Sequence, residues 1–147
     1  MTNHSTMISL VANLAKVKSE QDTTAALEIY HPEVELQSPG FGALAKGGKE
    51  VRQQLNLFFG LFPDYEVTLT QQALNDEVLL ATGVAAITLN SPTKTCPRIQ
   101  VPVFMEFHFL DEKISKEVFF LDAGMVCRKS GVSVDELSAA IQALQSI

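Results

Sequence analysis

The hydrophobic pattern of the chain changes at Pro63, and this change constrains the fold more than any other feature. Before Pro63, apolar residues recur at helical spacing, as in "GGKEVRQQLNLFFGLFPD", which predicts an amphipathic helix ending at Pro63-Asp64. After Pro63 we predict strands in "YEVTLTQQAL", "EVLLATGVAAITL", "RIQVPVFMEFHFL" and "KISKEVFFLD". Helices followed by a run of antiparallel strands are typical of an α+β fold.

Further helices are predicted at both ends of the chain. An apolar stripe over residues 8–17, continued by Lys18, predicts the first, and residues 23–30 form a second, capped by Asp22. In the tail, Ser133 and Glu136 have capping-box spacing ahead of an apolar helical stripe. With 147 residues and no linker, we predict one domain over residues 1–147. We expect residues 1–7 to be flexible and residues 133–147 to form a C-terminal helical extension.

Composition narrows the classes of partner. The chain is 46% hydrophobic with a net charge of -6, and its basic residues are scattered. This argues against nucleic acid, whose phosphates need basic patches, and against an anionic membrane. Cys96 and Cys127 lie apart and form no metal-ligand pattern, so we predict no metal site and a cytoplasmic protein with free thiols.

The last two strands form a predicted hairpin with a turn at Asp111-Glu112. Pairing Leu110 with Lys113 and alternating from there divides the side chains into two faces. This register sets Glu106 opposite Glu117, which is unfavourable for like charges and would be relieved by a bulge. His108 falls on the outer face. The predicted interior face, which would line an apolar pocket, carries Val103, Met105, Phe107, Val118 and Phe120, with Asp122 at its end.

The motifs "GGKEVRQQLNLFFGLFPDYEV", "NDEVLLATGVAAITL" and "VFMEFHFLDEKISKEVFFLD" together resemble the SnoaL-like group of the nuclear-transport-factor-2-like (NTF2-like) superfamily. The resemblance covers roughly residues 8 to 128. It implies a cone-shaped α+β barrel, with N-terminal helices packed on a curved antiparallel sheet. It also implies a small-molecule pocket and a homodimer, which we expect to form through the outer sheet face.

The resemblance also suggests site residues. In polyketide cyclases of this group, an Asp matching Asp122 is the acid/base; the alternative is a polar residue that ends the strand. Tyr30 is a candidate oxyanion donor, or else a core tyrosine with its hydroxyl at the rim. Steroid isomerases with this fold place a base where this chain has Ser38 or Gln37, so that route is disfavoured. The Arg and carboxylate of related epoxide hydrolases are also missing from the inward residues of "VPVFMEF".

These observations lead to two hypotheses. The first is a cyclase, isomerase or lyase without cofactor that acts on an apolar carbonyl compound, with Asp122 moving the proton. The second is a non-catalytic ligand-binding or dimeric interaction module, because few polar groups are predicted in the pocket. In a variant of the second, the C-terminal helix and the outer sheet face form an assembly surface.

Overall fold

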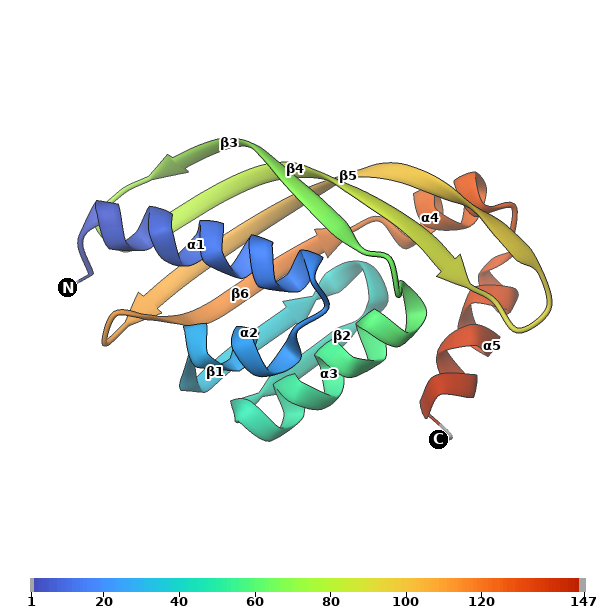
Figure 1. The fold of residues 1–147 in the computed structure, drawn as a ribbon, viewed down its shortest axis with the longest axis horizontal. Coiled ribbons are helices and arrows are strands. Elements are labelled where there is room, and N and C mark those ends of the chain that lie inside the picture. Colours follow the sequence, from blue (N-terminus) through green and yellow to red (C-terminus); the bar gives the residue numbers. More distant parts are fainter. Residues whose placement is uncertain (1, 146–147) are drawn as a thin grey trace.

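The structure is a computed structural model that describes residues 2–145, and it has the predicted α+β fold class. Five helices and a short 3-10 turn accompany one six-stranded sheet (Figure 1). The helices are α1 (His4–Ser19), α2 (Thr23–Ile29), α3 (Gly47–Leu61), α4 (Ala123–Ser130) and α5 (Val134–Gln145). The strands are β1 (Tyr30–Ser38), β2 (Ala43–Lys46), β3 (Glu66–Leu74), β4 (Val78–Asn90), β5 (Thr95–Leu110) and β6 (Lys113–Leu121), with η1 (Pro39–Phe41) after β1.

The sheet has the strand order β2-β1-β6-β5-β4-β3. Four of its strand pairs are antiparallel, but β1 pairs with β6 in parallel. The expected all-antiparallel sheet is therefore wrong at this one junction. The chain between β1 and β6 supplies the long crossover that a parallel pair requires. The sheet is strongly curved and remains open, with β2 and β3 at its edges (Figure 1).

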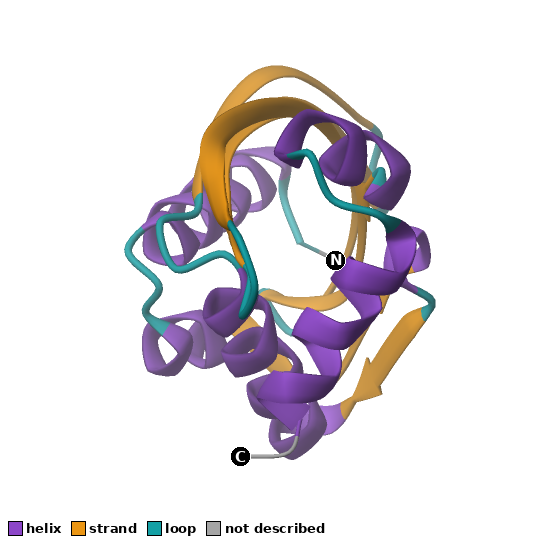
Figure 2. Ribbon diagram, turned by 90° about the vertical axis from the view of Figure 1, so that its right-hand side faces the viewer, coloured by secondary structure: helices purple, strands orange, loops and turns teal. Residues whose placement is uncertain are grey.

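Helices α1, α2 and α3 cover one face of the sheet, and α4 and α5 lie together at one end (Figures 1 and 2). Buried Met7, Val11 and Leu14 form the apolar stripe of α1, and Lys18 continues this stripe. Burial of such a stripe, rather than helix propensity, provides most of a helix's stability. Helix α1 begins at His4 and is capped by Asn3, so residues 4–7 of the segment expected to be flexible are helical, and residue 1 lies outside the described residues.

The β5–β6 hairpin has the predicted turn but a different register beyond it. Asp111 and Glu112 have positive φ angles of 53° and 59°, as in a two-residue hairpin turn, and Leu110 pairs with Lys113. After the Phe109–Ile114 pair, however, the register shifts by one residue, so that His108 pairs with Lys116. Ser115 is the extra residue of this β-bulge. Beyond it, every β6 side chain faces the side opposite to the one predicted.

The ends of the last helices follow local capping rules. Ser133 and Glu136 exchange the predicted capping-box bonds, each 3.1 Å long, at the start of α5. Residues 146–147 of the expected extension lie outside the described residues. Helix α4 was not predicted from the sequence. It begins after Asp122, whose carboxylate accepts bonds from the backbone N–H groups of Gly124 and Met125, and ends at Gly131 with a φ of 74°.

Candidate functional site

The bulge at Ser115 places Glu117 between the sheet and the helices, where the side chain is 1% exposed. Its Oε2 atom lies 3.3 Å from Nζ of Lys18, which comes from the end of α1. Its Oε1 atom accepts a hydrogen bond from the hydroxyl of Tyr30 at the start of β1. A buried carboxylate needs such partners, because removal from water without them is costly. We call Lys18, Tyr30 and Glu117 the buried charge cluster.

The two tyrosines near Glu117 are held in their protonated form. Burial raises the pKa of Tyr30 well above its usual value, and the negative charge of Glu117 raises it further. Tyr65, which is also buried, has its pKa raised for the same two reasons. Tyr30 therefore acts as a hydrogen-bond donor to the carboxylate over the whole physiological pH range.

The buried charge cluster borders a small internal void of about 10 Å³ between α1 and the sheet. Lys18, Tyr65, Met105, Phe107 and Glu117 contribute to its lining. That volume has room for about one water molecule. The interior of the cone is thus filled mainly by the protein's own side chains.

Three aromatic rings lie beside the buried charge cluster. Phe58 of α3, Tyr65 and Phe119 of β6 pack edge to face, with ring centroids 5.1 to 6.3 Å apart. Nζ of Lys18 lies 4.7 Å from the centroid of the Phe119 ring, which is a cation–π contact. We call these three rings the aromatic wall.

On the other side of the aromatic wall lies a cleft of about 360 Å³, bounded by η1 and β2, α3 and α5. Phe58 and Phe119 of the wall form part of its lining, together with apolar residues such as Phe41, Leu57, Leu61 and Ile141. Its polar lining groups include Ser38, Gln54 and Gln145. The volume is in the range typical of small-molecule sites. Figure 2 shows the end of the molecule at which α4 and α5 lie.

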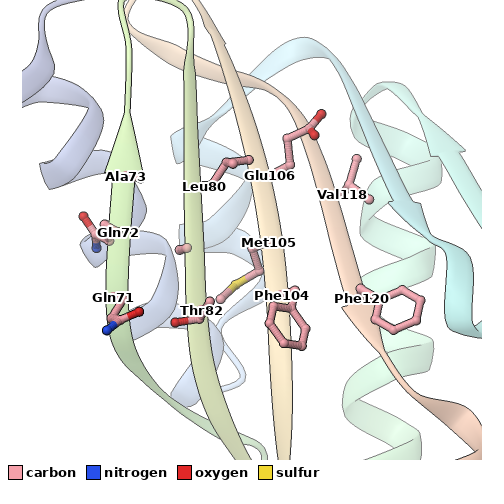
Figure 3. Close-up of a pocket in the computed structure, with 11 residues that line it drawn as sticks. Gln71, Gln72, Ala73, Leu80, Thr82, Phe104, Met105, Glu106, Val118 and Phe120 are labelled. Atoms are coloured by element: carbon pink, nitrogen blue, oxygen red, sulfur yellow. The ribbon is translucent and has the colours of Figure 1, made fainter.

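A larger and more open hollow of about 770 Å³ lies on the opposite, outer face of the sheet (Figure 3). It is formed by side chains of β3 to β6, including exposed Leu80, Phe104 and Phe120. Phe104 and Phe120 are directly opposed on neighbouring strands, and Figure 3 shows them at one end of the hollow. Because the buried charge cluster is on the other side of the sheet, the smaller cleft is the better candidate for chemistry.

The structure places the residues that the sequence grouped as a pocket on both faces of the sheet, although Met105 also contributes to the lining of the outer hollow. Val103, Met105 and Phe107 are buried and face the helices, and Tyr30 is buried with them. Val118 and Phe120 line the outer hollow instead, so their predicted interior position is wrong. The predicted position of Asp122 at the pocket mouth is also wrong, because its exposed side chain caps α4. The one-residue bulge causes all three errors.

Sequence reasoning missed Lys18 and Glu117 as site residues, although each left a signal. Lys18 continues an apolar helical stripe, where a solvated lysine is not expected. Glu117 stood opposite Glu106 in the unbulged register, and the bulge removes this clash by pairing Glu106 with Val118 and Glu117 with Phe107. His108 lies on the outer face, as predicted. Its Nε2 atom lies 2.8 Å from Oε2 of Glu106.

Within residues 2–145, no cluster of three or more His, Cys, Asp or Glu side chains has the arrangement of a metal site. Among the helices described, none combines the length and the apolar character needed to span a membrane.

The curved sheet and its helical cover have the NTF2-like fold, and comparisons with solved structures agree. A protein with a ketosteroid isomerase-like fold from Catenulispora acidiphila, in complex with trimethylamine, has a TM-score of 0.76 at 16% identity, covering 86% of this chain and 95% of that one. A candidate SnoaL-like polyketide cyclase from Jannaschia sp. has a TM-score of 0.75 at 14% identity, covering 88% and 94%. TerC, co-crystallised with polyporic acid, has a TM-score of 0.72 at 14% identity, covering 84% and 97%.

The family model of the SnoaL-like domain matches residues 11–117. The chain therefore belongs to the SnoaL-like family. No curated protein matches it in a sequence comparison. At the identities of the solved structures, their likeness shows the fold alone.

Proposed function

We propose that this protein binds a small, mostly apolar carbonyl compound in the cleft and that Glu117 acts on it as a general acid/base. The observation that carries the proposal is a buried carboxylate, held by a hydroxyl and an ammonium group, behind the wall of a cleft of ligand size. Two structural neighbours support a ligand of this kind. The Jannaschia protein is described as a candidate polyketide cyclase, and TerC is co-crystallised with polyporic acid.

The proposed chemistry is removal of a proton from the carbon next to a carbonyl group. Glu117 would accept the proton, while Tyr30 keeps its hydrogen bond to the same carboxylate and fixes its orientation. The Lys18 ammonium has three donors and one bond to Glu117, so it has donors left for the developing enolate oxygen. The apolar surroundings exclude water, which strengthens these interactions.

Glu117 is preferred to Asp122 because of what each carboxylate already contacts. Asp122 is exposed and accepts two backbone N–H bonds of its own helix, which is a structural role. Among the described residues, Glu117 is bonded only by the side chains of Lys18 and Tyr30, which can also serve a ligand. An acid/base role for Asp122 remains a prediction that the same experiment tests.

The test is exchange of α-protons in D₂O, with β-tetralone and cyclohexanone as probes and ¹H NMR as the readout. We expect the wild type to accelerate exchange, Glu117→Gln to lose the acceleration, and Asp122→Asn to retain it. Asn keeps the capping oxygen, so Asp122→Asn is the matched control. If Asp122→Asn loses the acceleration of exchange and Glu117→Gln retains it, the acid/base role belongs to Asp122.

The second candidate function is a ligand-binding module without chemistry, and the closed interior favours it. Only about 10 Å³ of void adjoins Glu117, and the aromatic wall separates this void from the cleft. In that case the ketone probes would shift cleft resonances in the wild type, such as those of Leu57, while proton exchange stayed at the rate without protein.

The outer hollow supports the proposal of a homodimer through the sheet face. Leu80, Phe104 and Phe120 are 42% to 53% exposed around it, which is unusual for neighbouring large apolar residues. We expect Phe104→Glu to convert a dimer to a monomer in analytical ultracentrifugation. Val134→Glu, at an exposed apolar residue on α5, is the control and should leave the dimer intact.

A cytoplasmic location is part of the same proposal. Cys96 and Cys127 are both free in the structure, which fits a reducing compartment. Fractionation of cells that express the tagged protein tests this point, and recovery outside the cytoplasm would contradict it.

A further inference from the structure

Phe119 is the residue at which the cleft and the buried charge cluster meet. Its side chain lines the cleft, and the same ring contacts the Lys18 ammonium. Phe119 is nearly fully buried, so the contact is shielded from water. A ligand in the cleft therefore reaches Lys18 and Glu117 only when this ring moves.

The Lys18 ammonium restricts what can replace the ring. It is buried, and within the described part of the chain its partners are Glu117, through one hydrogen bond of 3.3 Å, and the π face of Phe119. Loss of that face would leave a buried cation with less compensation, which is unfavourable. A replacement must present either its own π face or an oxygen acceptor to Lys18.

The neighbouring rings restrict the shape of the replacement. Phe58 and Tyr65 meet Phe119 nearly at right angles, with interplanar angles of 85° and 70°. Their edges and faces therefore bound a slot that fits one flat ring. The adjoining cleft of about 360 Å³ provides the space into which Phe119 can turn.

We propose that Phe119 is a movable gate and that the ligand is a planar aromatic or conjugated molecule with a hydroxyl or carbonyl oxygen. Its ring replaces that of Phe119 beside Phe58, and its oxygen points toward Lys18 and Glu117. This inference rests on the proposed function, because the ligand enters by the same cleft, and it adds the chemical class of the ligand.

The first experiment measures binding of phenol, benzene and cyclohexanol by titration calorimetry to the wild type and to Phe119→Ala. Phenol should bind to Phe119→Ala about tenfold more tightly than it binds to the wild type. Phenol should also bind to Phe119→Ala about tenfold more tightly than cyclohexanol binds to the same variant. Adding Lys18→Met to Phe119→Ala should abolish the preference for phenol. Phe120→Ala removes the adjacent phenylalanine on the outer face, and this control should bind phenol as the wild type does.

Equal affinity of Phe119→Ala for the three probes would show that the vacated space does not select for an aromatic ring with an oxygen. This result would overturn the inferred ligand class. If Phe119→Ala does not fold, NMR of the wild type with phenol provides the second measurement, with Phe119→Leu used to assign the Phe119 ring. Movement of the Phe119 ring resonances together with those of Leu57 supports the gate. Movement of Leu57 alone refutes the gate but leaves cleft binding intact, whereas no movement at either residue counts against both proposals.

Discussion

The two faces of the β5–β6 hairpin differ in which side chains they bury and which they expose. The inner face carries a charged residue, Glu117, at 1% exposure, and supplies it with two partners from distant elements. The outer face leaves Phe104 53% exposed and Phe120 42% exposed. A buried carboxylate and an exposed aromatic pair are each unfavourable alone, and the hairpin carries them on opposite sides of the sheet.

The largest expected effect comes from breaking the inner ion pair. Glu117→Ala leaves the Lys18 charge buried without its partner and should lower the free energy of unfolding by about 3–5 kcal/mol. Urea denaturation provides the measurement. The double variant Lys18→Met/Glu117→Leu should recover most of this loss, because no charge then remains buried. A loss below about 1 kcal/mol in the single variant would mean that Lys18 finds water or another partner.

The second prediction compares phenylalanines on the two faces of β5. Phe107→Ala opens a cavity in the core and should cost about 3–5 kcal/mol. Phe104→Ala, on the outer face, should cost less than about 1 kcal/mol at protein concentrations low enough to exclude dimers. Thermal and urea unfolding measure both variants. Equal costs would contradict the assignment of the two faces of β5.

The third prediction concerns pH, because Tyr30 and Tyr65 are the only tyrosines of the chain and both are buried. Burial and the charge of Glu117 raise the pKa of both in the folded state. Their contribution to stability is fully present below pH about 10, the usual tyrosine pKa. It is lost as the pH rises above that value toward the folded-state pKa, since only the unfolded chain releases these protons.

In an alkaline titration, tyrosinate absorbance should therefore appear together with the loss of circular dichroism. Tyrosinate that forms while the secondary structure is intact would show that water reaches the buried charge cluster. The Phe119→Leu variant extends the test. Its smaller side chain should admit more water through the aromatic wall, so tyrosinate should form at a lower pH than in the wild type.

The smallest effect is expected at Asp122. Asp122→Ala removes the cap of α4 and should cost about 1 kcal/mol, whereas Asp122→Asn keeps an accepting oxygen and should be nearly neutral. The two variants have equally lost the acid, so a stability difference between them reports on capping alone. Equal and large losses of stability would contradict the capping role.

Much of the fold followed from local patterns in the sequence. The period change at Pro63, the turn at Asp111-Glu112 and the Ser133–Glu136 capping box each depend on neighbouring residues, and each is present in the structure. The C-terminal half of the candidate site was misread because strand alternation offers two faces. Both faces of β6 carry apolar residues, so the alternation gave no signal of the bulge at Ser115 that exchanges them.

Tertiary structure decided the rest. The bulge at Ser115 lets Glu117 meet Lys18, which is 99 residues away, and Tyr30, which is 87 residues away. No local rule joins such distant residues, because their pairing depends on how α1 packs on the sheet and how β1 aligns parallel to β6. The sequence by itself thus determined the elements and the class of the fold. The packed structure decided which carboxylate is buried, since only there do the cost of desolvation and the available partners become defined.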